Sequence, residues 1–172
     1  MASVKMERKG AMSDVLRQIG ANLKTAKVRV GIFSNATTTD GKLIAEYATY
    51  NEFGTSRIPA RPFMRTTIQN HTNEWQDTFA GMIKGKAEDP IAVDKALRMV
   101  GIQAVGHIRQ TIKSNLPPPN AESTRRKKTK VITGAKGKPM RDGNGDVVTY
   151  APGTLIDTGA MIQAIAFEVN PE

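Results

Sequence analysis

Residues 50–65 read YNEFGTSRIPARPFMR, and this stretch decides where two helices end and begin. Its two prolines, three residues apart, restrict the backbone to extended conformations and stop a helix that reaches them. Gly54 suits the left-handed turn with which many helices end. The sequence therefore predicts one helix from about residue 42 to residue 51 and another from residue 62 or 63 to about residue 84.

On the N-terminal side, apolar residues first follow helical spacing and then alternate with polar ones. The helical spacing, with Ser13 as N-cap, predicts an amphipathic helix over residues 13–24 after a polar arm. The alternation over residues 27–33 predicts a half-buried strand. The side chains expected to face inward are Met12, Val15, Leu16, Ile19 and Leu23 in this helix, Val28, Val30 and Ile32 in the strand, and Leu43, Ile44, Tyr47 and Ala48 in the helix over 42–51.

On the C-terminal side, a second long helix is predicted over residues 90–114, with proline at its first position. Gly101 and Ala104 lie on its apolar stripe and leave room for another element to approach closely. Three prolines at 117–119 end this helix. The expected inward-facing side chains are Phe63, Ile68, His71, Trp75, Phe79 and Met82 in the helix from residue 63, and Val93, Leu97, Val100, Gly101, Ala104, Val105, Ile108 and Ile112 in the helix over 90–114.

The last third of the chain changes character. Residues 116–153 are rich in proline, glycine and basic side chains, and DGNGD at 142–146 is a strong turn signal for a hairpin between about 138–141 and 147–150. Asp157 or Thr158 is expected to cap a short helix, and residues 166–169 to form a final strand.

These elements predict an α+β fold in which a small mixed or antiparallel sheet packs against two longer helices, with extended arms. The expected organisation is an N-terminal arm over residues 1–12 and a core domain over 13–115 plus 154–170. A basic arm or β-hairpin insertion over residues 116–153 completes it. We expect both arms to be disordered in solution and to order on a partner, because the hydrophobic content is only 39%.

The composition excludes several classes of function. The chain has no cysteine, which excludes thiolate nucleophiles, disulfides and cysteine-based zinc sites. Its N-terminus does not read as a signal peptide, and no apolar run approaches the roughly 18 residues of a membrane span. No membrane partner is therefore expected.

Catalytic and metal-binding residues are not predicted. His71 and His107 have no second histidine four residues away, and both are expected to be structural. The neighbouring carboxylates Glu88 and Asp89 fit a helix start. The alternating acids of 142–146 lack the glutamate at position 12 of a calcium loop. We therefore expect a protein that is not an enzyme and that needs no cofactor.

Charge is concentrated in one segment. The net charge is +9, and residues 123–141 carry eight Lys/Arg and no acid, whereas residues 142–172 carry five acids and no base. The basic segment can contact DNA phosphates without reading sequence, or face solvent or an acidic protein surface. No aromatic residue interleaves with it, which disfavours base stacking. Its candidate contact residues are Arg125, Arg126, Lys127, Lys128, Lys130, Lys136, Lys138 and Arg141.

Residues 50–65 also resemble the signature of tailed-phage virion morphogenesis proteins, the neck, tail-completion and minor tail protein Z-like group. The resemblance lies in the Glu-Phe-Gly-Thr stretch at 52–55, the Pro-Ala-Arg-Pro-Phe stretch at 59–63 and the long helix that follows. LIDTGAM at 155–161 is similar to that group's helix start near the C-terminus. The basic segment departs from the compact members, so no role for it follows from the resemblance.

The resemblance implies a structural subunit that forms a homo-oligomeric ring, such as a hexamer or dodecamer, and leaves a channel for genomic DNA. The implied location is the head–tail junction of the virion, with assembly in the host cytoplasm. The implied partners are portal-side connector proteins and tail terminator, tube or sheath proteins. The residues expected to dock onto other subunits are Glu52, Phe53, Gly54, Arg57, Pro59, Arg61, Pro62, Phe63 and Arg65, with Glu52 as an ion-pair partner within or between chains.

One alternative stays open from the residues alone. A sequence-independent DNA-binding protein that uses residues 125–141 would also explain the basic charge. It predicts a monomer or dimer with steeply salt-dependent affinity for DNA.

Overall fold

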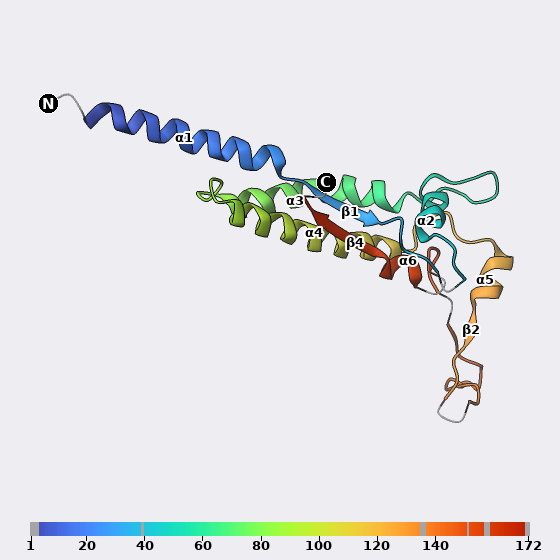
Figure 1. The fold of residues 1–172 in the computed structure, drawn as a ribbon. Helices are drawn as coiled ribbons and strands as arrows, with labels where there is room; N and C mark the ends of the chain where they lie inside the picture. The colour runs from blue at the N-terminus through green and yellow to red at the C-terminus, as the bar shows by residue number, and fades with distance from the viewer. Residues whose placement is uncertain (1–3, 39, 135–136, 151, 157–158, 171–172) are drawn as a thin grey trace. The chain divides into compact units, whose positions relative to one another are not determined.

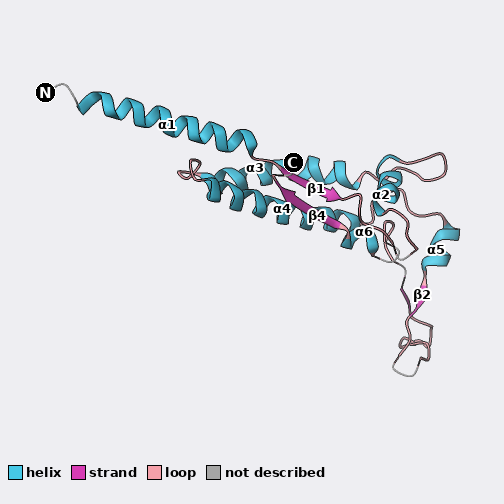
Figure 2. Cartoon of the chain, viewed as in Figure 1, coloured by secondary structure: helices cyan, strands magenta, loops and turns pink. Residues whose placement is uncertain are grey.

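The computed structural model describes residues 4–38, 40–134, 137–150, 152–156 and 159–170, with side chains from Met12 onward. The described residues form a mixed α+β fold of six helices and two antiparallel two-stranded sheets, as predicted (Figure 2). In chain order the elements are α1 (Val4–Thr25), β1 (Val28–Ile32), α2 (Ile44–Phe53), α3 (Phe63–Ile83), α4 (Pro90–Lys113), α5 (Glu122–Lys128), β2 (Lys130–Val131), β3 (Thr149–Tyr150), α6 (Ala160–Gln163) and β4 (Ile165–Val169).

The chain divides into two compact units, each assembled from separate stretches of sequence. The first comprises Met1–Gly31, Thr67–Ile108 and Ile165–Glu172, and the second comprises Ile32–Thr66 and Arg109–Ala164. Residues 116–153, predicted as a separate arm, belong to the second unit.

In the first unit, a two-stranded sheet packs against α4. β1 and β4 lie side by side and run in opposite directions (Figure 1). Arg29 and Glu168 form an ion pair across the two strands, with 3.7 Å between nitrogen and oxygen. A Cβ atom built on Gly101 of α4 would lie 2.3 Å from the ring of Phe167 in β4. The close approach predicted at Gly101 is thus confirmed, because only a residue without a side chain leaves room for that ring.

The core follows the stripe predicted for α4. Every member of that stripe is buried, and Ala96 joins it. Phe63, the first residue of α3, is also buried, at 1% exposure. Elsewhere the predicted faces are partly wrong. Ile68 and Met82 of α3 and Leu43 and Tyr47 at α2 are exposed, whereas Ile44 and Ala48 are buried as expected.

α1 differs from its prediction at both its start and its apolar face. The helix begins at Val4, so residues 4–12 are helical rather than an extended arm. Met12, Val15, Leu16 and Leu23 were expected to face inward but are exposed. Near the C-terminal end of α1, Asn22 bonds to the segment before α4. Its Nδ2 donates to Ala87 O at 3.2 Å and to Glu88 O at 2.9 Å.

A hairpin is present within residues 116–153, but its paired strands differ from those predicted over 138–141 and 147–150. β2 pairs with β3, and isolated antiparallel bridges join Thr133 to Pro139 and Arg141 to Val147. The side chain of Asp142 closes the predicted turn, since its Oδ1 accepts the amides of Asn144 and Asp146 at 2.9 and 3.0 Å.

Residues 122–128 were not expected to be helical, yet they form α5. Glu122 and Arg126, one turn apart, pair on its surface with 2.5 Å between oxygen and nitrogen. The predicted cap residues Asp157 and Thr158 lie outside the described residues. α6 begins after Gly159, whose φ of 81° is in the left-handed region.

Candidate docking site

Gly54 ends α2 in a conformation that other residues resist. Its φ is 78° and its ψ is 172°, a region of backbone space that is essentially restricted to glycine. A Cβ atom added here would lie 2.9 Å from Ala60 N and 3.1 Å from Ile58 O. The predicted helix-ending glycine with a positive φ is confirmed, but its ψ of 172° lies outside the left-handed helical region.

The loop from residue 54 to residue 62 folds on itself through backbone and hydroxyl contacts. Thr55 N donates to Ile58 O at 2.8 Å, and Thr55 Oγ1 accepts the amides of Arg57 and Ile58 at 3.2 and 3.0 Å. At its far end, Arg61 N donates to Asn51 O in α2 at 2.6 Å. A loop with this many internal bonds loses conformational freedom before any partner arrives.

Glu52 joins the end of α2 to the beginning of α3. Its side chain is only 7% exposed, and its two carboxylate oxygens accept the amides of Met64 at 2.9 Å and Arg65 at 3.1 Å. Amides in the first turn of a helix have no partner within the helix, so this carboxylate serves as the cap of α3 and also suits the positive end of its dipole.

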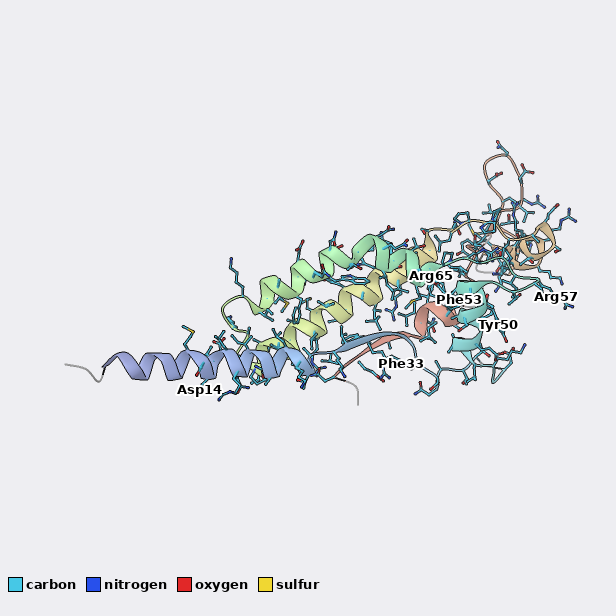
Figure 3. The ribbon with its side chains drawn as sticks, turned by 90° about the horizontal axis from the view of Figure 1, so that it is seen from above. Asp14, Phe33, Tyr50, Phe53, Arg57 and Arg65 are labelled. Carbon is cyan, nitrogen blue, oxygen red and sulfur yellow. The ribbon has the colours of Figure 1, made fainter. Side chains whose placement is uncertain are left out.

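Arg65 completes this arrangement from the first turn of α3. Its Nε donates to Glu52 Oε1 at 3.0 Å, and a terminal nitrogen donates to Glu52 O at 2.8 Å. The guanidinium carbon lies 5.0 Å from the centre of the Phe53 ring (Figure 3). Of the two partners that sequence analysis left open for Glu52, the structure shows the one within the chain.

Arg61 is buried, although the sequence analysis placed it among the docking residues. It is 4% exposed, its Nε donates to Pro118 O at 2.8 Å, and a terminal nitrogen donates to Pro119 O at 3.3 Å. Burial lowers the pKa of the Arg61 guanidinium from its ordinary value. Arg61 therefore anchors the proline run to the loop, and its side chain is not available on the surface of the isolated chain.

The predicted docking residues thus fall into two groups. Glu52, Arg61 and Phe63 are buried and hold the loop together, and Gly54 and Pro62 are half-buried. The exposed members are Phe53, Arg57, Pro59 and Arg65. Arg57 lies in the loop that follows α2, and Phe53 and Tyr50 on that helix are also exposed (Figure 3). Tyr50 was not among the predicted docking residues, and its helical spacing from Tyr47, which was expected to face inward, does not distinguish an exposed ring from a buried one.

The candidate DNA-contact residues divide in a similar way. Three of them bond within the chain: Arg126 to Glu122, Lys128 Nζ to Ile156 O at 3.0 Å, and Arg141 to Gly145 O at 2.6 Å. Arg125, Lys127, Lys130 and Lys138 are exposed, and Lys136 lies outside the described residues. Arg125 and Lys128 also line a pocket of 310 Å³ beside the proline run, where Asn115 Oδ1 accepts Thr154 N at 3.0 Å.

Within the described residues, one cluster has the composition of a metal site. Ligand atoms of His71, Glu74 and His107 all lie within 4.8 Å of one another. His71 Nδ1 is 3.0 Å from one Glu74 oxygen, and His107 Nε2 is 3.7 Å from the other. The predicted metal signal was a second histidine four residues away, which does not cover Glu74, three residues from His71, or His107 on the next helix.

The ring geometry does not favour chelation by both histidines. Their centroids are 3.8 Å apart and their planes differ by 17°, and an imidazole binds a metal in the plane of its ring. No single point near the cluster lies in both planes. Trp75 Nε1 also donates to His107 Nδ1 at 3.0 Å, which places the proton of neutral His107 on Nε2. The cluster is therefore a hydrogen-bonded aromatic stack between α3 and α4.

Comparison with protein-family models, with curated proteins and with solved structures finds no match to this chain. Among the described residues, no helix has both the length and the apolarity needed to cross a lipid bilayer.

Proposed function

We propose that this chain is a structural subunit of a tailed-phage virion that assembles into a homo-oligomeric ring at the head–tail junction. In this proposal the ring joins the portal-side connector to the tail terminator, tube or sheath and leaves a channel for genomic DNA. Binding is the whole mechanism, and no residue acts as a catalyst.

The observation that carries the proposal is the preorganised loop between α2 and α3. Glu52, Gly54, Thr55 and Arg61 each form hydrogen bonds to backbone groups of neighbouring residues within the chain. Arg57 is left exposed on this rigid support. Because the backbone at Arg57 is already ordered, pairing of its guanidinium with a carboxylate or a carbonyl group of a neighbour costs only the side-chain entropy.

The sequence signature at residues 50–65 supports the same proposal. Its Glu, Gly, Arg and Phe positions are those that build the loop, so the resemblance rests on residues with a defined structural task. The exposed apolar side chains along α2, Leu43, Tyr47, Tyr50 and Phe53, also suit a subunit that is covered by another protein.

Mass measurement of the purified protein tests the proposal. We expect particles whose mass is an integer multiple of 18.7 kDa, seen as closed rings by electron microscopy. Arg57→Ala is expected to weaken assembly by roughly tenfold, because it removes one charged contact per interface. Arg98→Ala is the matched control, since Arg98 pairs with Asp94 on the surface of α4. A wild-type chain that stays monomeric at all concentrations would refute the ring.

The second candidate is sequence-independent DNA binding through the basic segment. The exposed cations Arg125, Lys127, Lys130 and Lys138 favour it, because the segment 123–141 contains no acid that would neutralise them. It predicts an affinity whose logarithm falls linearly with the logarithm of salt concentration, with a slope that decreases by about one for each phosphate contact removed. Replacement of Arg125 and Lys127 by alanine should therefore flatten that slope, and an unchanged slope would remove this candidate.

A further inference from the structure

α1 carries an apolar stripe that nothing described in its own unit covers. Met12, Leu16 and Leu23 are 62%, 61% and 40% exposed, and Val15 beside them is 42% exposed. Together with the half-buried Ile19, positions 12, 16, 19 and 23 are separated by four, three and four residues, the spacing of a helix-packing seam. Ala21 lies on the opposite, polar face of the helix.

A second apolar stripe runs along α2 and belongs to the other unit. Leu43, Tyr47 and Tyr50 follow one another at intervals of four and three residues and are 46%, 40% and 40% exposed. Leu43 and Tyr47 border an open pocket of 710 Å³, whose wall includes Leu155 and Met161. The pocket gives this stripe the concave neighbour that a packed helix requires.

The two helices have opposite charge. α1 has five Lys/Arg against two Asp/Glu in its sequence, and one of these cations, Arg17, pairs with Asp14 on the helix surface. α2 has no basic residue. Of its two glutamates, Glu46 is exposed between Leu43 and Tyr47, whereas Glu52 is buried as the cap of α3. Both stripes are therefore apolar, and the net charges of the helices that carry them are opposite in sign.

We propose that the α1 stripe of one copy of this chain packs onto the α2 stripe of the next copy, as a helix docked in a groove. Two different patches that bind each other form a heterologous interface, which closes into a ring when the rotation between neighbouring copies divides a full turn. The inference rests on the proposed ring and identifies the contact that builds it.

The size of the contact is adequate for this purpose. A helix of 22 residues is about 33 Å long and about 10 Å wide with its side chains. One buried face of such a helix covers several hundred Å², and a standard interface buries about 800 Å² on each partner. Each subunit of a ring makes the contact twice, once through each stripe, so a modest contact suffices for assembly.

Two substitutions damage one stripe each. Leu16→Asp puts a carboxylate into the α1 stripe, and Leu43→Asp puts one into the α2 stripe, at the N-cap position where aspartate is favourable for the helix. Each is expected to raise the dissociation constant of self-association by roughly 100-fold, because the charge must lose its water in the seam. The controls Ala21→Asp and Thr49→Asp put the same charge on exposed positions outside the stripes and should assemble like the wild type.

Mixing the two variants distinguishes this arrangement from others. The Leu16→Asp chain keeps an intact α2 stripe and the Leu43→Asp chain keeps an intact α1 stripe, so the mixture should form a one-to-one dimer and no ring. Native mass spectrometry measures this directly. Rings formed by both single variants would overturn the inference and leave the ring proposal standing. A mixture that stays monomeric would also overturn the inference, because the intact stripes would then have failed to bind. A monomeric wild type would overturn both proposals.

Discussion

Removal of the Glu52 carboxylate tests whether one buried acid determines where α3 begins. Glu52→Ala leaves the amides of Met64 and Arg65 without the acceptors that now lie 2.9 and 3.1 Å away. Bonds to a charged acceptor contribute about 1.5–3 kcal/mol each, and loss of a helix cap costs about 1 kcal/mol. The two amides share one carboxylate, so we expect the free energy of unfolding to fall by about 3 kcal/mol.

Arg65→Met separates the cap from the ion pair. The Arg65 side chain is 55% exposed, so its pair with Glu52 and its contact with the Phe53 ring should together contribute only about 1 kcal/mol. Glu52→Gln keeps an oxygen acceptor without the charge. Its loss of unfolding free energy should lie between those of Glu52→Ala and Arg65→Met.

Urea unfolding at low protein concentration measures the free energy of unfolding of Glu52→Ala, Arg65→Met and Glu52→Gln. Hydrogen exchange at the amides of Met64 and Arg65 gives a local readout, which should accelerate in Glu52→Ala and remain slow in Arg65→Met. Equal losses of stability in these two variants, with equal exchange, would show that the ion pair rather than the cap holds the junction, and would refute the reasoning.

Three further predictions use single contacts described above. Gly54→Ala should lower the free energy of unfolding by about 3 kcal/mol in urea titrations, because it combines a disfavoured backbone conformation with a backbone clash. Gly101→Ala should be destabilising by about 1–2 kcal/mol, since its Cβ meets the Phe167 ring, and combination with Phe167→Leu should restore stability through the better helix former. Hydrogen bonding from His71 lowers the pKa of Glu74, so Glu74 stabilises the fold above the ordinary glutamate pKa of about 4.3, and this contribution is lost as pH falls through the lower folded value. The difference in Tm between wild type and Glu74→Gln should therefore shrink between pH 5 and pH 3, and a constant difference would contradict it.

The long helices and the strands could be predicted because their signals are local. The stripe of α4, its proline start and its proline stop all lie within one continuous segment, and burial follows that stripe. Gly101 was readable as a contact point because a helix rarely keeps a glycine in its apolar face without a packing reason.

The exposed faces of α1 and α2 could not be predicted in the same way. An apolar stripe at helical spacing indicates that a face is to be covered, but it does not say by what. Leu16 and Tyr47 satisfy the pattern of a core residue and are nevertheless exposed in the isolated chain. The role of Arg61 was missed for a related reason, because its partners are backbone carbonyls of Pro118 and Pro119, which leave no trace in side-chain chemistry.

The tie between Arg61 and the proline run has a consequence for how this chain tolerates change. These hydrogen bonds fix the beginning of the segment that carries the hairpin. In contrast, β2, β3 and the turn at 142–146 contain no buried residue. Additions or deletions at the turn therefore leave the core untouched. Among related proteins, the length of this turn should vary more than that of the core elements. In the laboratory, the turn is a suitable place to insert an epitope.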